Sequence, residues 1–195
     1  MIEAKEDFNN TWPFKANFFS GNGFKQHYVD EGKEHKKVIL CLHGEPTWGY
    51  IYRHFIRELS KDFRVVVPDL MGFGKSETPK NKEYSLKTHV ENLENLVNYL
   101  KLENIYFVGQ DWGGPILGAY TLRNLKNTKC MFLINTILWY SRTEKPKELT
   151  PWFKWIKKNE DNGTLEVLLG ELNTTILSIM KILNFTNSSI IDDNW

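Results

Sequence analysis

The chain has 195 residues, of which 41% are hydrophobic and 25% are charged, a profile that excludes a disordered or fibrous protein and fits about one ordinary soluble domain. The formal net charge is +1, and basic residues are interleaved with acidic ones, so no nucleic-acid partner is indicated. The first seven residues lack the apolar segment of a signal peptide, and no apolar run approaches the roughly 20 residues of a membrane helix. These features predict a cytoplasmic protein without membrane contact.

Five short apolar runs alternate with stretches of helical periodicity, which is the rhythm of a βαβ protein with a mostly parallel sheet. The continuous apolar runs are typical of strands buried on both faces. A weaker strand at residues 26–29 is expected towards one edge. In chain order the sequence predicts strands at residues 26–29, 38–42, 65–67, 105–108 and 131–134, and helices at residues 50–60, 86–100 and 114–125.

The chain changes character after Asn135, and no strand signal returns. Residues 143–151 are polar and contain two prolines, and residues 152–185 have helical periodicity. Two apolar stripes mark this helical segment, the first at Leu165, Val167, Leu168 and Leu172, the second at Ile176, Ile179, Met180 and Leu183. We therefore predict a sheet domain over residues 1–135 and a separate helical segment over residues 136–195.

Only two cysteines occur, Cys41 and Cys130, and each lies inside an apolar segment. This placement predicts two buried thiols rather than a disulfide.

The most specific chemical signal is Val108-Gly109-Gln110-Asp111-Trp112-Gly113-Gly114, which follows a predicted strand and precedes a predicted helix. The pattern is that of a nucleophile elbow, with aspartate in the position that serine usually holds. Small flanking residues suit a sharp strand-to-helix turn, because larger side chains would collide there. The dipole and N–H groups of the helix N-terminus favour a carboxylate. The alternative is a structural turn in which Asp111 only caps the helix.

A second signal, Leu42-His43-Gly44-Glu45-Pro46, follows the first buried strand, where this type of fold supplies part of its oxyanion site. The amides of Glu45 and Trp112 are the predicted donors. His43 is interpreted as a residue that shapes the loop, not as a catalytic base.

A third segment ends in Gly74-Lys75-Ser76, which resembles the end of a phosphate-binding loop. That motif also needs a glycine five residues before Gly74, where this chain has Asp69. We therefore interpret the segment as a connecting loop and predict no nucleotide, metal or other cofactor.

Together these segments resemble the haloalkane dehalogenases of the α/β-hydrolase fold. The resemblance rests on His43-Gly44-Glu45-Pro46-Thr47-Trp48, Gly72-Phe73-Gly74-Lys75-Ser76 and Gln110-Asp111-Trp112-Gly113-Gly114, and it covers nearly all of residues 8–140. It implies an α/β-hydrolase-type sheet, mostly parallel and flanked by helices, with an incomplete helical cap.

The resemblance also implies a reaction. Asp111 would attack a halogen-bearing carbon to form an alkyl ester, and indole N–H groups would hold the departing halide in a dry pocket. Trp112 fits the first donor. The cap segment of the family falls on Trp152, with Trp155 as the alternate, although either could be a packing residue. The expected partners are a halogenated alkane and halide, and a complete protein is expected to be a monomer.

The remaining catalytic groups of the family are not visible in this chain. All five histidines precede Asp111, whereas the family places its histidine after the nucleophile and the acid. One position that the family uses for the acid holds Asn135. We therefore expect a chain truncated on its C-terminal side, which would be inactive or would alkylate once without turnover.

Two other functions stay open from the sequence. An epoxide hydrolase would use the same nucleophile with two cap tyrosines as acids, but Tyr140 is the only tyrosine after the elbow helix. A non-catalytic remnant is the alternative from another class, and the absence of a histidine after Asp111 favours it.

Overall fold

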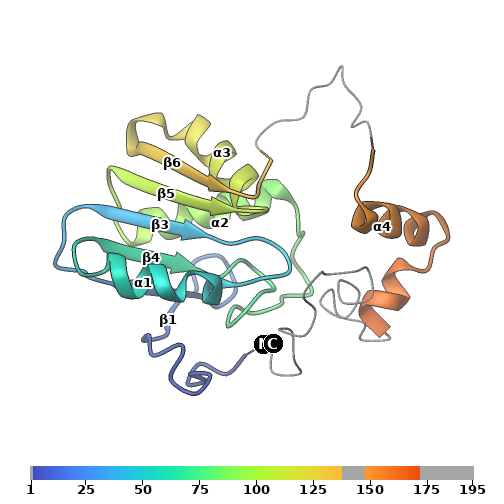
Figure 1. Cartoon of the computed structure of the whole chain (residues 1–195), viewed down its shortest axis with the longest axis horizontal. Helices are drawn as coiled ribbons and strands as arrows, with labels where there is room; N and C mark the ends of the chain where they lie inside the picture. The colour runs from blue at the N-terminus through green and yellow to red at the C-terminus, as the bar shows by residue number, and fades with distance from the viewer. Residues whose placement is uncertain (1, 138–147, 172–195) are drawn as a thin grey trace. The chain divides into compact units, whose positions relative to one another are not determined.

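One mixed sheet of six strands organises the first part of the chain, in the order β1-β2-β4-β3-β5-β6 (Figure 1). The computed structural model describes residues 2–137 and 148–171. Neighbouring strands from β4 to β6 run parallel, and β1 and β2 join the sheet antiparallel. The strands are β1 Asn17–Phe19, β2 Gln26–Glu31, β3 Val38–Leu42, β4 Arg64–Pro68, β5 Ile105–Gln110 and β6 Thr128–Ile134. All five predicted strands are confirmed, and β1 is an additional one outside β2.

Helices cover both faces of this sheet, and the alternation of side chains along β3 explains why both faces are apolar. Leu40 and Leu42 pack in one core with residues of the helices α2 and α3, whereas Ile39 and Cys41 pack in the other with Ile56 of α1. The helices are α1 Arg53–Leu59, preceded by a short 3-10 helix η1 at Gly49–Tyr52, α2 Leu86–Tyr99 and α3 Gly113–Arg123, followed by a short 3-10 helix η2 at Leu125–Asn127. The predicted mostly parallel sheet flanked by helices is therefore confirmed.

Strand β6 differs from the prediction in its burial. It pairs with β5 and with no other described strand, and Phe132 in its middle is 64% exposed. Cys130 is also exposed, so the prediction of two buried thiols is right for Cys41 and wrong for Cys130. An apolar run identifies a strand but does not show how many of its faces are covered, and this caused the error.

The loop after β4 is fixed by the fully buried carboxylate of Asp69. Its Oδ2 atom accepts hydrogen bonds from the backbone N–H of Lys75 at 2.9 Å and from Nδ1 of His27 at 2.8 Å, and its Oδ1 atom accepts one from the backbone N–H of Gly49 at 2.9 Å. One side chain thus joins β2, the loop after β3 and the loop after β4. These contacts explain why an aspartate, Asp69, stands where a phosphate-binding loop would need a glycine.

The N-terminal segment is tied to the same loop by the buried side chain of Lys75. Its ammonium group donates to the backbone carbonyl oxygens of Ala4 at 2.9 Å and Glu6 at 2.6 Å. A buried cation is tolerable only with such partners.

The chain divides into two units, residues 1–139 and 140–195. In the second unit the structure describes the helix α4 Pro151–Asp161 and a π-helix, η3, at Val167–Glu171. Thr150 caps α4 by accepting a hydrogen bond from the N–H of Phe153. A turn at Asn162 and Gly163 separates α4 from the helical residues that follow it. Of the two predicted stripes, Leu172, Ile176, Ile179, Met180 and Leu183 lie outside the described residues, and the predicted domain boundary after residue 135 stays a prediction.

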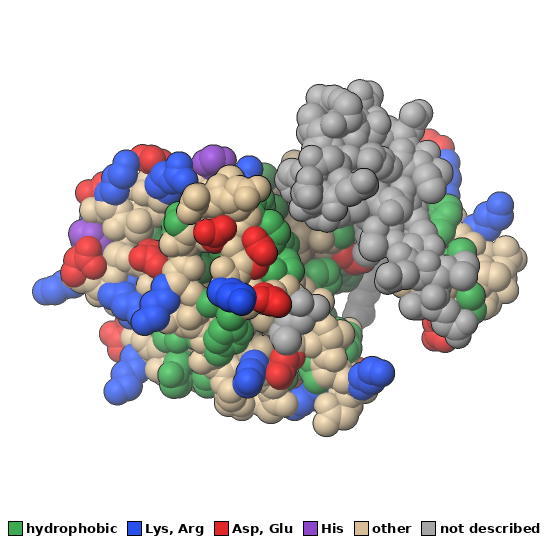
Figure 2. All heavy atoms as spheres, turned by 90° about the horizontal axis from the view of Figure 1, so that it is seen from below, with side chains coloured by type: hydrophobic (Ala, Val, Ile, Leu, Met, Phe, Trp, Pro, Cys, Tyr) green, Lys and Arg blue, Asp and Glu red, His purple; other side chains and the backbone are tan. Residues whose placement is uncertain are grey.

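The described surface of the first unit mixes charges of both signs. Figure 2 shows basic and acidic side chains alternating over the face in view, without a cluster of one sign among the described residues there. No described helix is both long enough and apolar enough to cross a membrane.

Candidate active site

Asp111 occupies the sharp turn between β5 and α3. Its φ angle is +50°, in the left-handed region that residues other than glycine rarely adopt. Its Oδ1 atom accepts a hydrogen bond from the backbone N–H of Glu45 at 2.8 Å. The structure thus brings together the predicted nucleophile and one predicted amide donor, which are 66 residues apart in the sequence.

Two glycines allow this close approach. A Cβ atom on Gly44 would overlap Oδ1 of Asp111 and the backbone nitrogen of Trp112. A Cβ atom on Gly113 would overlap the carbonyl oxygen of Leu42 at the end of β3. The loop after β3 therefore touches the elbow closely, and both the Asp111 carboxylate and the Trp112 backbone nitrogen lie beside Gly44. The role of the Trp112 amide as a donor stays a prediction.

Residues that follow β6 hold the backbone of the elbow from the other side. The N–H of Asp111 donates to the carbonyl oxygen of Asn135 at 3.3 Å, and the hydroxyl of Thr136 donates to the carbonyl oxygen of Asp111. The same carbonyl accepts the N–H of Gly114 at 3.0 Å. Asn135, which we identified as one position for the catalytic acid, thus lies next to the elbow, but its amide side chain cannot ionise.

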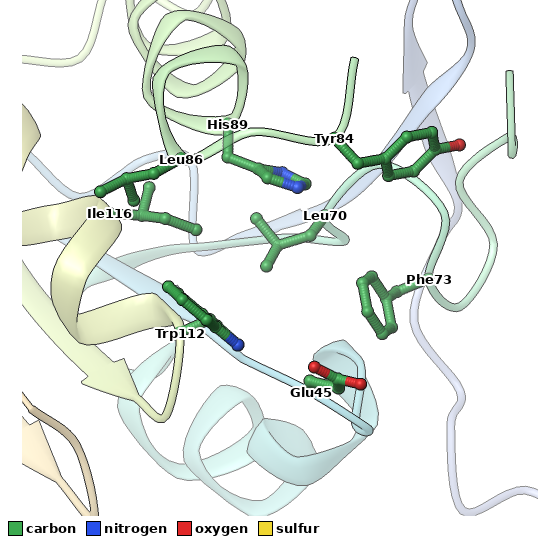
Figure 3. Close-up of a pocket in the computed structure, with 8 residues that line it drawn as sticks. All are labelled: Glu45, Leu70, Phe73, Tyr84, Leu86, His89, Trp112 and Ile116. Atoms are coloured by element: carbon green, nitrogen blue, oxygen red, sulfur yellow. The ribbon is translucent and has the colours of Figure 1, made fainter. Parts of the chain in front are cut away.

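A cavity of about 320 Å³ opens beside the elbow, at the carboxyl ends of the parallel strands (Figure 3). This is where ligands bind in open α/β sheets. Most of its lining is apolar or aromatic, and the indole of Trp112 forms part of the wall while remaining 49% exposed. The lining residues are Glu45, Leu70, Phe73, Tyr84, Leu86, His89, Trp112 and Ile116.

Six of these lining residues were not predicted as site residues. They come from the loop after β4, the start of α2 and the first turn of α3. The rule that loops at the carboxyl ends of parallel strands surround the site could have identified the loop after β4. No local pattern distinguishes Tyr84 or His89 from ordinary residues at the start of a helix.

The Glu45 side chain faces Trp112 across this cavity, and the indole nitrogen of Trp112 points towards its carboxylate in Figure 3. Burial raises the pKa of Glu45, the charge of Asp111 raises it further, and hydrogen bonding from the Trp112 side chain acts in the opposite direction. One residue therefore binds Asp111 through its backbone N–H and directs its side chain towards Trp112.

His43 is fully buried, and backbone hydrogen bonds occupy both of its ring nitrogens. Nε2 accepts the N–H of Leu70 at 2.9 Å, so Nδ1 carries the proton and donates to the carbonyl oxygen of Gly44 at 2.9 Å. Burial lowers the pKa of His43. A neutral imidazole without an available nitrogen suits the predicted shaping role and not that of a base.

His89 is the histidine that lines the cavity. Its pKa is lowered, first by burial and then by the proximity of His43. Its Nδ1 atom is buried without a hydrogen-bond partner in the described part of the chain.

The second predicted halide donor lies in the other unit. Trp152 and the alternate Trp155 both belong to α4, and their rings stack with centroids 5.7 Å apart and an angle of 10° between the planes. Their role stays a prediction, and Tyr140 lies outside the described residues. Within residues 2–137 and 148–171, no three histidine, cysteine, aspartate or glutamate side chains are grouped so that they could hold a metal ion.

Comparisons with known proteins identify the fold family and several relatives. The sequence profile of a family described as the alpha/beta hydrolase fold matches residues 37–169. Haloalkane dehalogenase 2 of Mycobacterium tuberculosis is 38% identical over 132 residues, which are 68% of this chain and 46% of the relative. A cis-3-alkyl-4-alkyloxetan-2-one decarboxylase of Shewanella oneidensis is 36% identical over 158 residues, which are 80% of this chain and 48% of that relative.

Among solved structures, the tetrameric haloalkane dehalogenase DpaA of Paraglaciecola agarilytica NO2 superimposes with a TM-score of 0.69 at 34% identity. The match covers 77% of this chain and 52% of DpaA. The chain thus spans about half the length of the relatives that it matches.

Proposed function

This chain belongs to the alpha/beta hydrolase fold family, and from that premise we propose that it is a hydrolase of carbon–halogen bonds with Asp111 as its nucleophile. The observation that carries the proposal is the 2.8 Å hydrogen bond from the Glu45 amide to Oδ1 of Asp111, at a strained turn beside an apolar cavity. The similarity to haloalkane dehalogenases at 34% and 38% identity supports it.

In the proposed reaction, a carboxylate oxygen of Asp111 forms a bond to the halogen-bearing carbon. The carbon–halogen bond breaks with its electron pair on the halide, and an alkyl ester remains on Asp111. The Glu45 amide fixes Oδ1, and no other described residue forms a hydrogen bond to this carboxylate, so Oδ2 is the oxygen available for attack. An apolar cavity favours this step, since water would solvate the carboxylate and weaken it as a nucleophile.

The leaving halide needs hydrogen-bond donors that do not bring water with them. The indole N–H of Trp112 lines the cavity and is the proposed first donor. Trp152, or Trp155 in its place, is the proposed second donor.

Hydrolysis of the ester needs a base that activates water, which is typically worth ~10²–10⁴-fold in rate. His43 cannot serve, because both of its ring nitrogens are engaged. The family that this chain resembles takes its base from a histidine after the nucleophile, and all five histidines here, His89 included, precede Asp111. We therefore propose that this chain alone forms the ester once and releases it slowly. We further propose that a complete protein of this type is a monomer, which size-exclusion chromatography with light scattering tests.

The proposed function is tested by incubating the full chain with 1-bromopropane. We expect one propyl group per chain by intact-protein mass spectrometry, located on Asp111 by peptide mapping, with one equivalent of bromide released. Asp111→Asn is the matched control and should give no adduct. Absence of an adduct in the folded wild-type chain, or equal labelling of Asp111→Asn, would reject the proposal in favour of a non-catalytic remnant.

A second candidate function is the opening of an oxetan-2-one ring. The alignment with the oxetan-2-one decarboxylase covers 80% of this chain, whereas the alignment with the dehalogenase covers 68%. Attack of Asp111 on the saturated ring carbon that is bonded to the ring oxygen would break that carbon–oxygen bond, form an alkyl ester on Asp111 and release the former lactone group as a carboxylate. The adduct would then retain the whole mass of the lactone, whereas the bromoalkane adduct lacks the bromine. The faster of the two labelling reactions identifies the preferred chemistry, and a 1,2-epoxide in a third reaction tests the epoxide hydrolase.

A further inference from the structure

The proposed function uses the backbone of Glu45 and leaves its side chain without a role. That carboxylate faces the indole N–H of Trp112, the same donor that the leaving halide needs. We propose that Glu45 and the halide compete for Trp112, so that each halide bound in the cavity is accompanied by one proton taken up on Glu45. This inference rests on the proposed function, because it deepens the description of the same anion site.

The first argument is geometric. The backbone N–H of Glu45 holds Asp111, so the position of the Glu45 main chain is fixed by a 2.8 Å hydrogen bond. The side chain of Glu45 extends from this fixed main chain and lines the cavity together with Trp112. An indole has one N–H, so it cannot fully serve a carboxylate and a halide at once.

The second argument is electrostatic. A halide at Trp112 would be the third negative charge in a small apolar cavity that already has the carboxylates of Asp111 and Glu45 nearby. Like charges that share an apolar cavity repel more strongly than in water, because the local dielectric constant is lower. Asp111 must stay ionised to act as the nucleophile, so Glu45 is the group that can lose its charge. The raised pKa of Glu45, caused by burial and by Asp111, agrees with this direction.

The other titratable groups around the cavity do not provide the same link. His43, at the end of β3, is buried with both ring nitrogens engaged. Tyr84, before α2, has its pKa raised by burial, and it stays neutral near pH 7. Asp69, after β4, is buried in its own hydrogen-bond network. His89, in α2, has its pKa lowered by burial and by His43, which opposes proton uptake, and a variant described below measures its contribution.

The test is a titration of the full chain with sodium bromide between pH 5 and pH 8.5 at constant ionic strength, followed by quenching of tryptophan fluorescence. Trp112→Phe supplies the background from the other tryptophans. We expect the apparent Kd of the wild-type chain to rise by up to about tenfold per pH unit above the pKa of Glu45. Glu45→Gln keeps the backbone N–H and should bind bromide with a Kd that is nearly independent of pH and lower than that of the wild type at pH 8.

His89→Asn is the matched control, because a protonated His89 would also attract bromide at low pH. It should keep the pH dependence of the wild type. Circular dichroism verifies that each variant is folded. The inference is overturned if the Kd of the wild type does not change with pH, if Glu45→Gln retains the slope, or if His89→Asn abolishes it.

These results remain separable from those on the proposed function. If 1-bromopropane labels Asp111 but the bromide affinity shows no dependence on Glu45, only the inference fails. If neither the wild type nor Glu45→Gln gives quenching that depends on Trp112, and no label reaches Asp111, both fail together.

Discussion

At Gly44, the absence of a side chain decides whether two loops can meet. Because an added Cβ would overlap Oδ1 of Asp111 and the nitrogen of Trp112, we expect Gly44→Ala to push the carboxylate away from the Glu45 amide. Labelling of Asp111 by 1-bromopropane should slow by about 10²–10³-fold, as when an oxyanion-hole donor is removed. The free energy of unfolding should fall by about 1–3 kcal/mol. Mass spectrometry over time measures the first effect and urea denaturation the second.

Gly163→Ala is the control for this substitution, since no atom lies within 4 Å of its added carbon. Gly163→Ala should leave the labelling rate unchanged. It should lower the free energy of unfolding, because the φ angle of Gly163 is +66°, which alanine adopts unfavourably. Equal labelling rates in Gly44→Ala and the wild type would contradict the proposed arrangement of the nucleophile.

At the scale of elements, β5 does not support the elbow alone: Asn135 and Thr136, which follow β6, both form hydrogen bonds to the backbone of Asp111. The hydroxyl of Thr136 donates to the carbonyl oxygen of Asp111, so Thr136→Val removes a hydrogen bond without changing the shape of the side chain much. We expect a loss of about 0.5–1.5 kcal/mol in the free energy of unfolding. Labelling should slow by roughly two- to tenfold if that energy is lost in the transition state.

Thr136→Ser restores the hydroxyl and should recover most of the labelling rate. If Thr136→Val labels Asp111 as fast as the wild type, the hydrogen bond from Thr136 to the Asp111 carbonyl has no influence on the nucleophile.

The elements themselves were largely predictable because buried strands have continuous apolar sequences. This held for β3, β4 and β5, whose strand pattern depends little on their neighbours. It failed for β1, because three residues are too short for a pattern. It failed for the burial of β6 and Cys130, because exposure depends on which strand lies beside an edge.

The candidate site was predictable in part for a related reason. Asp111 and Glu45 lie in motifs whose glycines are constrained by backbone contacts, so their local sequence carries a signal. Tyr84 and His89 line the cavity only because the tertiary structure brings α2 beside the elbow. The orientation of the Glu45 side chain towards Trp112 had no sequence signal either, since the two residues belong to separate loops.

At the scale of the whole molecule, buried histidines make stability depend on pH. Burial lowers the pKa of His43 below its ordinary value of 6.5, so the unfolded chain takes up a proton at a higher pH than the folded chain. The free energy of unfolding should therefore fall as the pH drops below 6.5, by up to about 1.4 kcal/mol per pH unit for this group. The lowered pKa of His89 adds a change of the same sign. Urea denaturation at a series of pH values measures the slope.

Glu45 contributes with the opposite sign, because its raised pKa favours the folded state as the pH falls. The slopes of His43→Gln and His89→Gln must therefore be compared with that of the wild type. Each variant should lose stability less steeply between pH 6.5 and pH 5.5. Slopes as steep as that of the wild type in both variants would show that neither imidazole is neutral in the folded protein.

The bond between the Lys75 ammonium and the carbonyls of Ala4 and Glu6 has a practical consequence for anyone who shortens this protein. Deleting the first seven residues would leave the buried Lys75 ammonium group without these two hydrogen-bond acceptors. The loop that carries Leu70 and Phe73 would then rearrange to let water reach that cation, and it would take one wall of the cavity with it. A tag placed before Met1 and left uncleaved is therefore a safer purification handle than a trimmed start.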